Sequence, residues 1–161
     1  LKSLVMKNMI MYSQTLDNLP QSLKSFEISS MNYDQKLDNL PKSLKILTIV
    51  SEHLNIKLDN LPKNLKFLSI LSFSYNQSLD NLPNSLKYLK ITSLLFSKKL
   101  DNLPQLLKYL EIDANKFNQK VDKLPEKLRT LAISCDCFDQ EIDKLPEYLE
   151  ILEILGNIGI H

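Results

Sequence analysis

The chain has 161 residues, a formal net charge of +1 and 43% hydrophobic residues, a composition that suits one globular domain. It holds no apolar run near the ~18 residues that cross a bilayer, so we expect no membrane segment. Charges of both signs nearly balance and Arg129 is the only arginine, a composition that argues against a dedicated nucleic-acid binder.

An internal repeat of 21 residues organises the whole chain. Every proline stands 21 residues from the next, with a leucine three residues later and an isoleucine eight residues later. Residues 1–15 fit a partial first coil that is one residue longer than its successors, and because Leu1 already stands within the repeat we expect further sequence upstream. We expect one repeat domain over 1–161, about seven and a half coils long, with a possible C-terminal cap at 155–161. The prolines that mark the coils are Pro20, Pro41, Pro62, Pro83, Pro104, Pro125 and Pro146.

Each unit contains one short strand. In "LKILTI" the residues Leu47 and Ile49 alternate with Ile46 and Thr48, which predicts a half-buried strand with one face inward. The next unit repeats the pattern, so a parallel stack with one strand per coil follows. The return path "LDNLP" holds a turn-forming Asp-Asn pair and a proline without an amide proton, so it predicts a turn rather than a central strand. Twenty-one residues leave little room for an α-helix, which favours a 3₁₀ turn or an extended segment there.

The residues also carry a family resemblance. The phrase from Leu107 to Ile112 has the Leu-x-x-Leu-x-Ile form of a leucine-rich repeat, and "YNQSLDNLPNSLKYLKI" from Tyr75 and "FNQKVDKLPEKLRTLAI" from Phe117 resemble FNIP repeats, known from amoebae and giant DNA viruses. The resemblance implies a mostly-β, leucine-rich-repeat-like right-handed solenoid, α/β in type, with one parallel sheet on its concave face and 3₁₀ or extended segments on its convex face. It also implies a recognition module, placed in some relatives behind an F-box that delivers bound proteins to a ubiquitin ligase; no F-box stands in these residues.

One column departs from ordinary leucine-rich repeats, where an inward asparagine usually stands. The neighbouring position is instead uniformly small, and we expect its hydroxyl groups to bond backbone groups at a tight corner. The column reads Ser30, Ser51, Ser72, Ser93, Ala114, Cys135 and Gly156.

Two charged columns have functional and structural interpretations. The aspartates could form a cation site, but an Asp that opens a tight turn is the better interpretation; they include Asp38, Asp59, Asp80 and Asp101. The lysines could form a track for polyanions, but structural compensation by the Asp column is favoured over nucleic acid; they include Lys45, Lys66, Lys87 and Lys108.

No arrangement for catalysis, a metal or a cofactor is evident. His53 and His161 are isolated, glycine is nearly absent, and Cys135 and Cys137 are too close in sequence for an unstrained disulfide. Two free thiols indicate a reducing compartment, so we expect an intracellular protein of the cytoplasm, that of the host cell if the chain is viral. We expect no enzyme.

A candidate binding surface comes from the strand positions that face away from the core. Four of them are apolar or aromatic in consecutive coils, which is typical of interface cores, although such residues also suit exposed strands. The predicted partner-binding residues are Ile46, Val50, Phe67, Leu71, Tyr88 and Tyr109.

The charge also drifts along the chain. Residues 1–120 carry sixteen lysines against ten acidic residues, whereas residues 121–161 carry four basic and nine acidic residues. Open repeat stacks expose strand edges at their ends, so salt-sensitive head-to-tail self-association is the main alternative to binding another protein.

Overall fold

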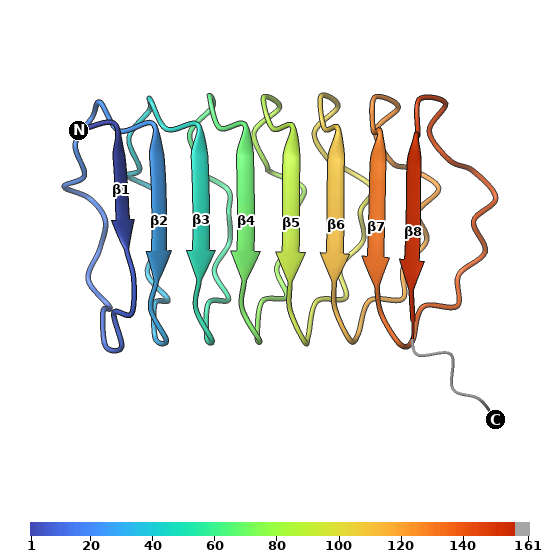
Figure 1. Cartoon of the computed structure of the whole chain (residues 1–161), viewed down its shortest axis with the longest axis horizontal. Coiled ribbons are helices and arrows are strands. Elements are labelled where there is room, and N and C mark those ends of the chain that lie inside the picture. Colours follow the sequence, from blue (N-terminus) through green and yellow to red (C-terminus); the bar gives the residue numbers. More distant parts are fainter. Residues whose placement is uncertain (157–161) are drawn as a thin grey trace.

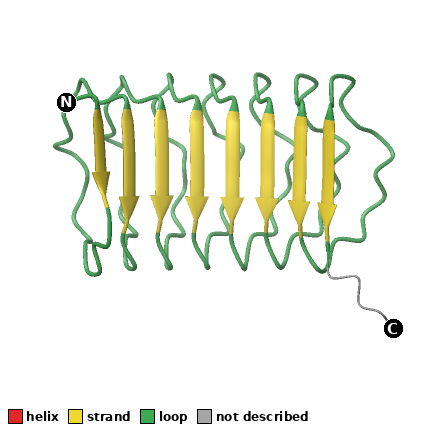
Figure 2. Cartoon of the chain, in the orientation of Figure 1, coloured by secondary structure: helices red, strands yellow, loops and turns green. Residues whose placement is uncertain are grey.

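Eight strands form one parallel sheet along a single stack of coils. The computed structural model describes residues 1–156, and Figure 1 shows the strands side by side in the order of the sequence, with the connecting loops behind them. Figure 2 shows only strands and loops over residues 1–156, so no helix there could cross a membrane. The strands are β1 (Ser3–Met6), β2 (Ser25–Ser29), β3 (Ile46–Val50), β4 (Phe67–Leu71), β5 (Tyr88–Thr92), β6 (Tyr109–Asp113), β7 (Thr130–Ser134) and β8 (Ile151–Leu155).

The register follows the 21-residue repeat with one exception. Leu47 of β3 lies beside Leu68 of β4, 21 residues on, whereas Ser3 of β1 lies beside Ser25 of β2, 22 residues on. Just after β1 the repeat is restored, because the Met9 amide bonds to the Ser29 carbonyl as later amides bond to the next coil. The extra residue therefore lies between β1 and Met9. Asn8 stands there with φ of 57°, a left-handed conformation that asparagine tolerates better than most residues.

Alternate strand residues build the core. Leu68 and Ile70 of β4 have no exposed surface, and the same alternation of buried and partly exposed residues runs from β2 to β7. A second column of rings lies between each strand and the next return segment in the sequence. Tyr75, Phe96 and Phe117 have no exposed surface and Phe138 is partly buried, and neighbouring rings stack at 6.0–6.2 Å between ring centroids. Each coil thus covers the apolar side chains of its neighbours, as a stable solenoid requires.

The return segments are turns and extended chain rather than 3₁₀ helix within residues 1–156. After each proline the amide of the third residue bonds to the proline carbonyl, as Leu44 does to Pro41 at 2.9 Å. The next amide, that of Lys45, already bonds to Lys24 of the preceding coil at 2.8 Å. A 3₁₀ helix needs consecutive bonds within the segment, and the sheet takes those amides instead.

The serine column works as expected. The hydroxyl groups of Ser51, Ser72 and Ser93 donate to carbonyl groups of the preceding coil at 2.7–2.9 Å, and all three serines are buried. Cys135 and Cys137 are free thiols, as expected, with their sulfur atoms 2.8 Å apart. The cap expected at 155–161 falls mostly on residues 157–161, outside the described residues.

Candidate protein-binding face

The predicted apolar positions share the outward face of the sheet. Figure 1 shows β3 to β6 as adjacent strands, and the first residues of these four strands pair directly across the sheet. We call this row the aromatic strip: Ile46, Phe67, Tyr88 and Tyr109. Val50 and Leu71, the last residues of β3 and β4, pair with each other at the other end of the strands. The structure therefore brings the strip into one row and places the second apolar pair about 13 Å along the strands from it, at about 3.3 Å per residue.

The three rings of the aromatic strip stack face to face. Ring centroids of Phe67 and Tyr88 are 4.3 Å apart and those of Tyr88 and Tyr109 are 4.2 Å apart, with interplanar angles of 12° and 5°. Parallel strands lie about 4.8 Å apart, so in-register rings come into van der Waals contact without bending the sheet. The rings are half-buried because they cover one another, whereas Ile46 remains 43% exposed and Leu71 38% exposed.

A polar network closes one end of the aromatic strip. The Lys90 ammonium lies 2.7 Å from one oxygen of Glu111, and the Tyr109 hydroxyl donates to the other oxygen at 2.7 Å. Burial alone would raise the pKa of Glu111, but the hydrogen bonds from Lys90 and Tyr109 bring it below its ordinary value. The hydrogen bond to Glu111 likewise raises the pKa of Lys90. Sequence reasoning missed this network, although Lys90 and Glu111 stand 21 residues apart and must therefore be neighbours in the sheet.

A row of lysines runs beside the aromatic strip, one residue before each strand. We call it the lysine row: Lys24, Lys45, Lys66, Lys87 and Lys108. Backbone bonds of 2.8–2.9 Å from each lysine amide to the preceding lysine carbonyl hold the row in register. Within residues 1–156 none of these five side chains forms a salt bridge. The row changes sign beyond Arg129, whose guanidinium pairs with Glu150.

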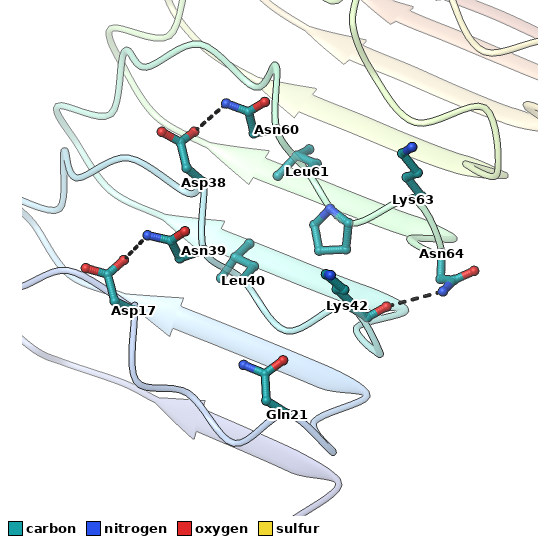
Figure 3. A pocket seen from close by; sticks show the side chains of 11 residues that line it. Asp17, Gln21, Asp38, Asn39, Leu40, Lys42, Asn60, Leu61, Lys63 and Asn64 are labelled. Atoms are coloured by element: carbon teal, nitrogen blue, oxygen red, sulfur yellow. Dashed lines mark hydrogen bonds between the residues drawn. The ribbon is translucent and has the colours of Figure 1, made fainter.

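The aspartate column has partners of its own. The carboxylates of Asp38, Asp59 and Asp80 lie in turns and accept hydrogen bonds from asparagine side chains of the next coil at 2.9–3.1 Å. Asp101 pairs with Lys123 at 3.3 Å. Figure 3 shows the start of this ladder, Asp17 with Asn39 and Asp38 with Asn60, along a groove of the return segments.

These contacts correct one expectation and agree with another. The aspartates do not compensate the lysine row by direct pairing, because among residues 1–156 no salt bridge joins the two columns. The aspartates do lie in turns, as the sequence predicts, and three of them bond to asparagine amides of the next coil. No group of three or more potential metal ligands occurs within residues 1–156.

The fold and this face define a leucine-rich-repeat-like solenoid, a class that commonly mediates protein–protein interaction through its sheet. The chain is similar to CroV588, whose crystal structure is described as a circular leucine-rich-repeat protein, with 30% sequence identity and a TM-score of 0.67. The match covers 84% of the present chain but only 24% of CroV588. No family profile and no curated protein matches the sequence.

Proposed function

We propose that the chain is a protein-binding module whose partner lies on the outward face of the sheet, over the aromatic strip. The observation that carries this proposal is the continuous stack of Phe67, Tyr88 and Tyr109 on a solvent-facing row, with Ile46 exposed at its end. Aromatic rings are enriched in the cores of interfaces, and held in a stack they lose little side-chain entropy on binding. Val50 and Leu71 extend the apolar area at the other end of β3 and β4.

The 21-residue phrase supports a more specific setting for this module. Under the same proposal the chain is an FNIP-type repeat, and a larger protein with an F-box would use it as the substrate-recognition part of a ubiquitin-ligase adaptor. Two free thiols suit a reducing compartment such as the cytoplasm.

Affinity capture from a cell lysate tests the module. The wild-type chain and a Phe67→Ala/Tyr88→Ala variant are immobilised, and retained proteins are identified by mass spectrometry after circular dichroism has shown both chains folded. We expect at least one protein to be retained by the wild type and reduced about tenfold or more by the variant, because central aromatic residues carry much of the binding energy of an interface.

A matched control separates the strip from exposed apolar surface in general. Phe73 and Leu94 are 49% and 46% exposed on the loops that follow β4 and β5, so Phe73→Ala/Leu94→Ala removes similar side chains outside the strip. Equal retention by wild type and both variants would refute the assignment of the binding site.

Self-association is a second candidate, and a specific observation favours it. Leu152 and Ile154 occupy core columns of β8 but are 41% and 38% exposed, and β8 is the last strand within residues 1–156. Within residues 1–156, β1 and β8 are the two edge strands of the sheet, and unpaired backbone groups of edge strands can pair with another chain.

A further inference from the structure

The lysine row carries more positive charge than the protein itself neutralises. Its five ammonium groups form no salt bridge within residues 1–156. Neighbouring coils are about 4.8 Å apart, well inside the Debye length of about 8 Å at physiological salt, so these charges repel one another in the free protein. A ligand with negative charges along the same line would remove that repulsion.

The lysine row, whose side chains form no salt bridge within residues 1–156, spans the same coils as the aromatic strip. The lysine row precedes β2 to β6, and the strip occupies β3 to β6. The other cations nearby are already paired, Lys90 with Glu111 and Arg129 with Glu150. The face therefore offers two parallel lines, one of free positive charge and one apolar, across the same strands.

The stacking of the rings distinguishes between the two polyanions that could fit. Single-stranded nucleic acid binds by stacking its bases on open faces of aromatic rings. Here the rings of Phe67, Tyr88 and Tyr109 are stacked at 4.2–4.3 Å, so Tyr88 is covered by a ring on both faces and Phe67 and Tyr109 are each covered by a ring on one face. Stacked in this way, Tyr88 presents its edge to a ligand rather than a face. Ring edges pack against aliphatic side chains, which favours a peptide with carboxylates on one side and apolar residues on the other.

The spacing distinguishes between the conformations of such a peptide. An extended peptide laid across the strands presents same-side residues about 6.6 Å apart, whereas an α-helix presents one position per turn of about 5.4 Å. The coil spacing of about 4.8 Å is nearer to the helix, and the mismatch of about 2.4 Å over four steps lies within the reach of flexible lysine side chains. We propose that the lysine row and the aromatic strip together bind an acidic amphipathic helix laid across β2 to β6. This inference rests on the proposed protein-binding function and specifies the partner.

A designed helical peptide tests the proposal directly. A fluorescein-labelled peptide of about eighteen residues carries one glutamate per turn on one side and leucines on the adjoining side. Its binding to the whole chain is measured by fluorescence anisotropy at low and high salt, beside a scrambled peptide of the same composition. We expect the helical peptide to bind about tenfold more tightly than the scrambled one, and binding to weaken with salt.

Two variants that each remove three positive charges test whether the peptide binds at the lysine row. Lys45→Gln/Lys66→Gln/Lys87→Gln neutralises the middle of the lysine row, whereas Lys36→Gln/Lys57→Gln/Lys99→Gln neutralises three exposed lysines of the return segments. We expect the first variant to lose about tenfold in affinity and the second less than about twofold. At low salt the first variant should also melt at a higher temperature than the wild type, because the repulsion along the row is relieved.

Three results would overturn the proposal: equal binding of the helical and scrambled peptides, equal losses in the two variants, or tighter row-dependent binding of an oligothymidylate of similar length. Capture of a lysate protein that needs Phe67 and Tyr88, together with no binding of the helical peptide, would refute the acidic helix while leaving the protein-binding function in place. Loss of the proposed function would appear instead as capture that is indifferent to Phe67 and Tyr88.

Discussion

Two tyrosine hydroxyl groups are buried without a hydrogen-bond partner among the described residues, those of Tyr33 and Tyr75. Both side chains have no exposed surface. An unpaired buried hydroxyl costs free energy, and burial also raises the pKa of both groups above the ordinary 10.0. Phenylalanine can replace tyrosine at this position, because Phe96 and Phe117 occupy the same column in later coils without a hydroxyl group.

We therefore expect Tyr33→Phe and Tyr75→Phe to leave stability unchanged or to raise it by about 1 kcal/mol. Chemical denaturation at neutral pH measures the change in the free energy of unfolding. Because burial raises the folded pKa values, the tyrosines ionise first in the unfolded chain, which lowers the stability of the wild type as the pH rises above about 10. The Phe variants should therefore keep more of their stability at alkaline pH. A loss of more than about 1 kcal/mol in either variant at neutral pH would show that the hydroxyl group has a partner.

At the scale of the element, a strand is stable because two neighbours cover it. Leu68 of β4 and Leu152 of β8 occupy the same column of the repeat, yet Leu68 has no exposed surface and Leu152 is 41% exposed. Local sequence is nearly the same for the two strands, so the difference comes from coverage by the next coil.

Leu68→Ala should cost about 2–5 kcal/mol in the free energy of unfolding, because it removes buried apolar surface and leaves a cavity between coils. Leu152→Ala, the matched change at the end of the stack, should cost less than about half of that, since much of its surface is already in water. Denaturant titrations of the two variants provide the comparison. Equal costs would mean that β8 is covered in solution, as it would be in a head-to-tail assembly.

At the scale of the whole molecule, the two ends of the stack are complementary in charge. Lys2 stands one coil before the lysine row, because the Lys24 amide bonds to its carbonyl, and Glu150 stands two coils after the row, beyond Arg129. A second copy that added its β1 to β8 would place its Lys2 beside Glu150, in the relation that Arg129 holds to Glu150 within the chain.

Head-to-tail association should therefore appear in light scattering as a mass that rises with concentration at low salt and falls at high salt. Glu150→Lys should weaken it, because the junction would then bring like charges together, whereas Glu126→Lys on an exposed return segment should not. A monomer at low salt and high concentration would exclude self-association and leave β8 open for other partners.

The repeat by itself determined the architecture. Prolines at a constant interval required equivalent coils, and the alternation of Leu47 and Ile49 with outward residues determined which face of the strand is buried. In-register stacking then placed Phe67 next to Tyr88 without further information, so the membership of the aromatic strip was predictable. The serine column was also correctly interpreted, because a buried hydroxyl at a corner must bond to the backbone.

Only the tertiary structure decided how the side chains between these columns pair. Because neighbouring coils are only about 4.8 Å apart, several side chains of the next coil lie within reach of each aspartate. The sequence alone does not show which of them forms the hydrogen bond. In the structure the Asn81 amide donates a hydrogen bond to the Asp59 carboxylate, and Lys66 forms no salt bridge within residues 1–156. The face-to-face orientation of the rings in the aromatic strip was also visible only in the structure, because a side-chain rotamer depends on the space that neighbouring strands leave for it. The sequence repeat therefore predicts the periodic backbone, whereas the hydrogen bonds and ion pairs of the outward face depend on contacts between coils.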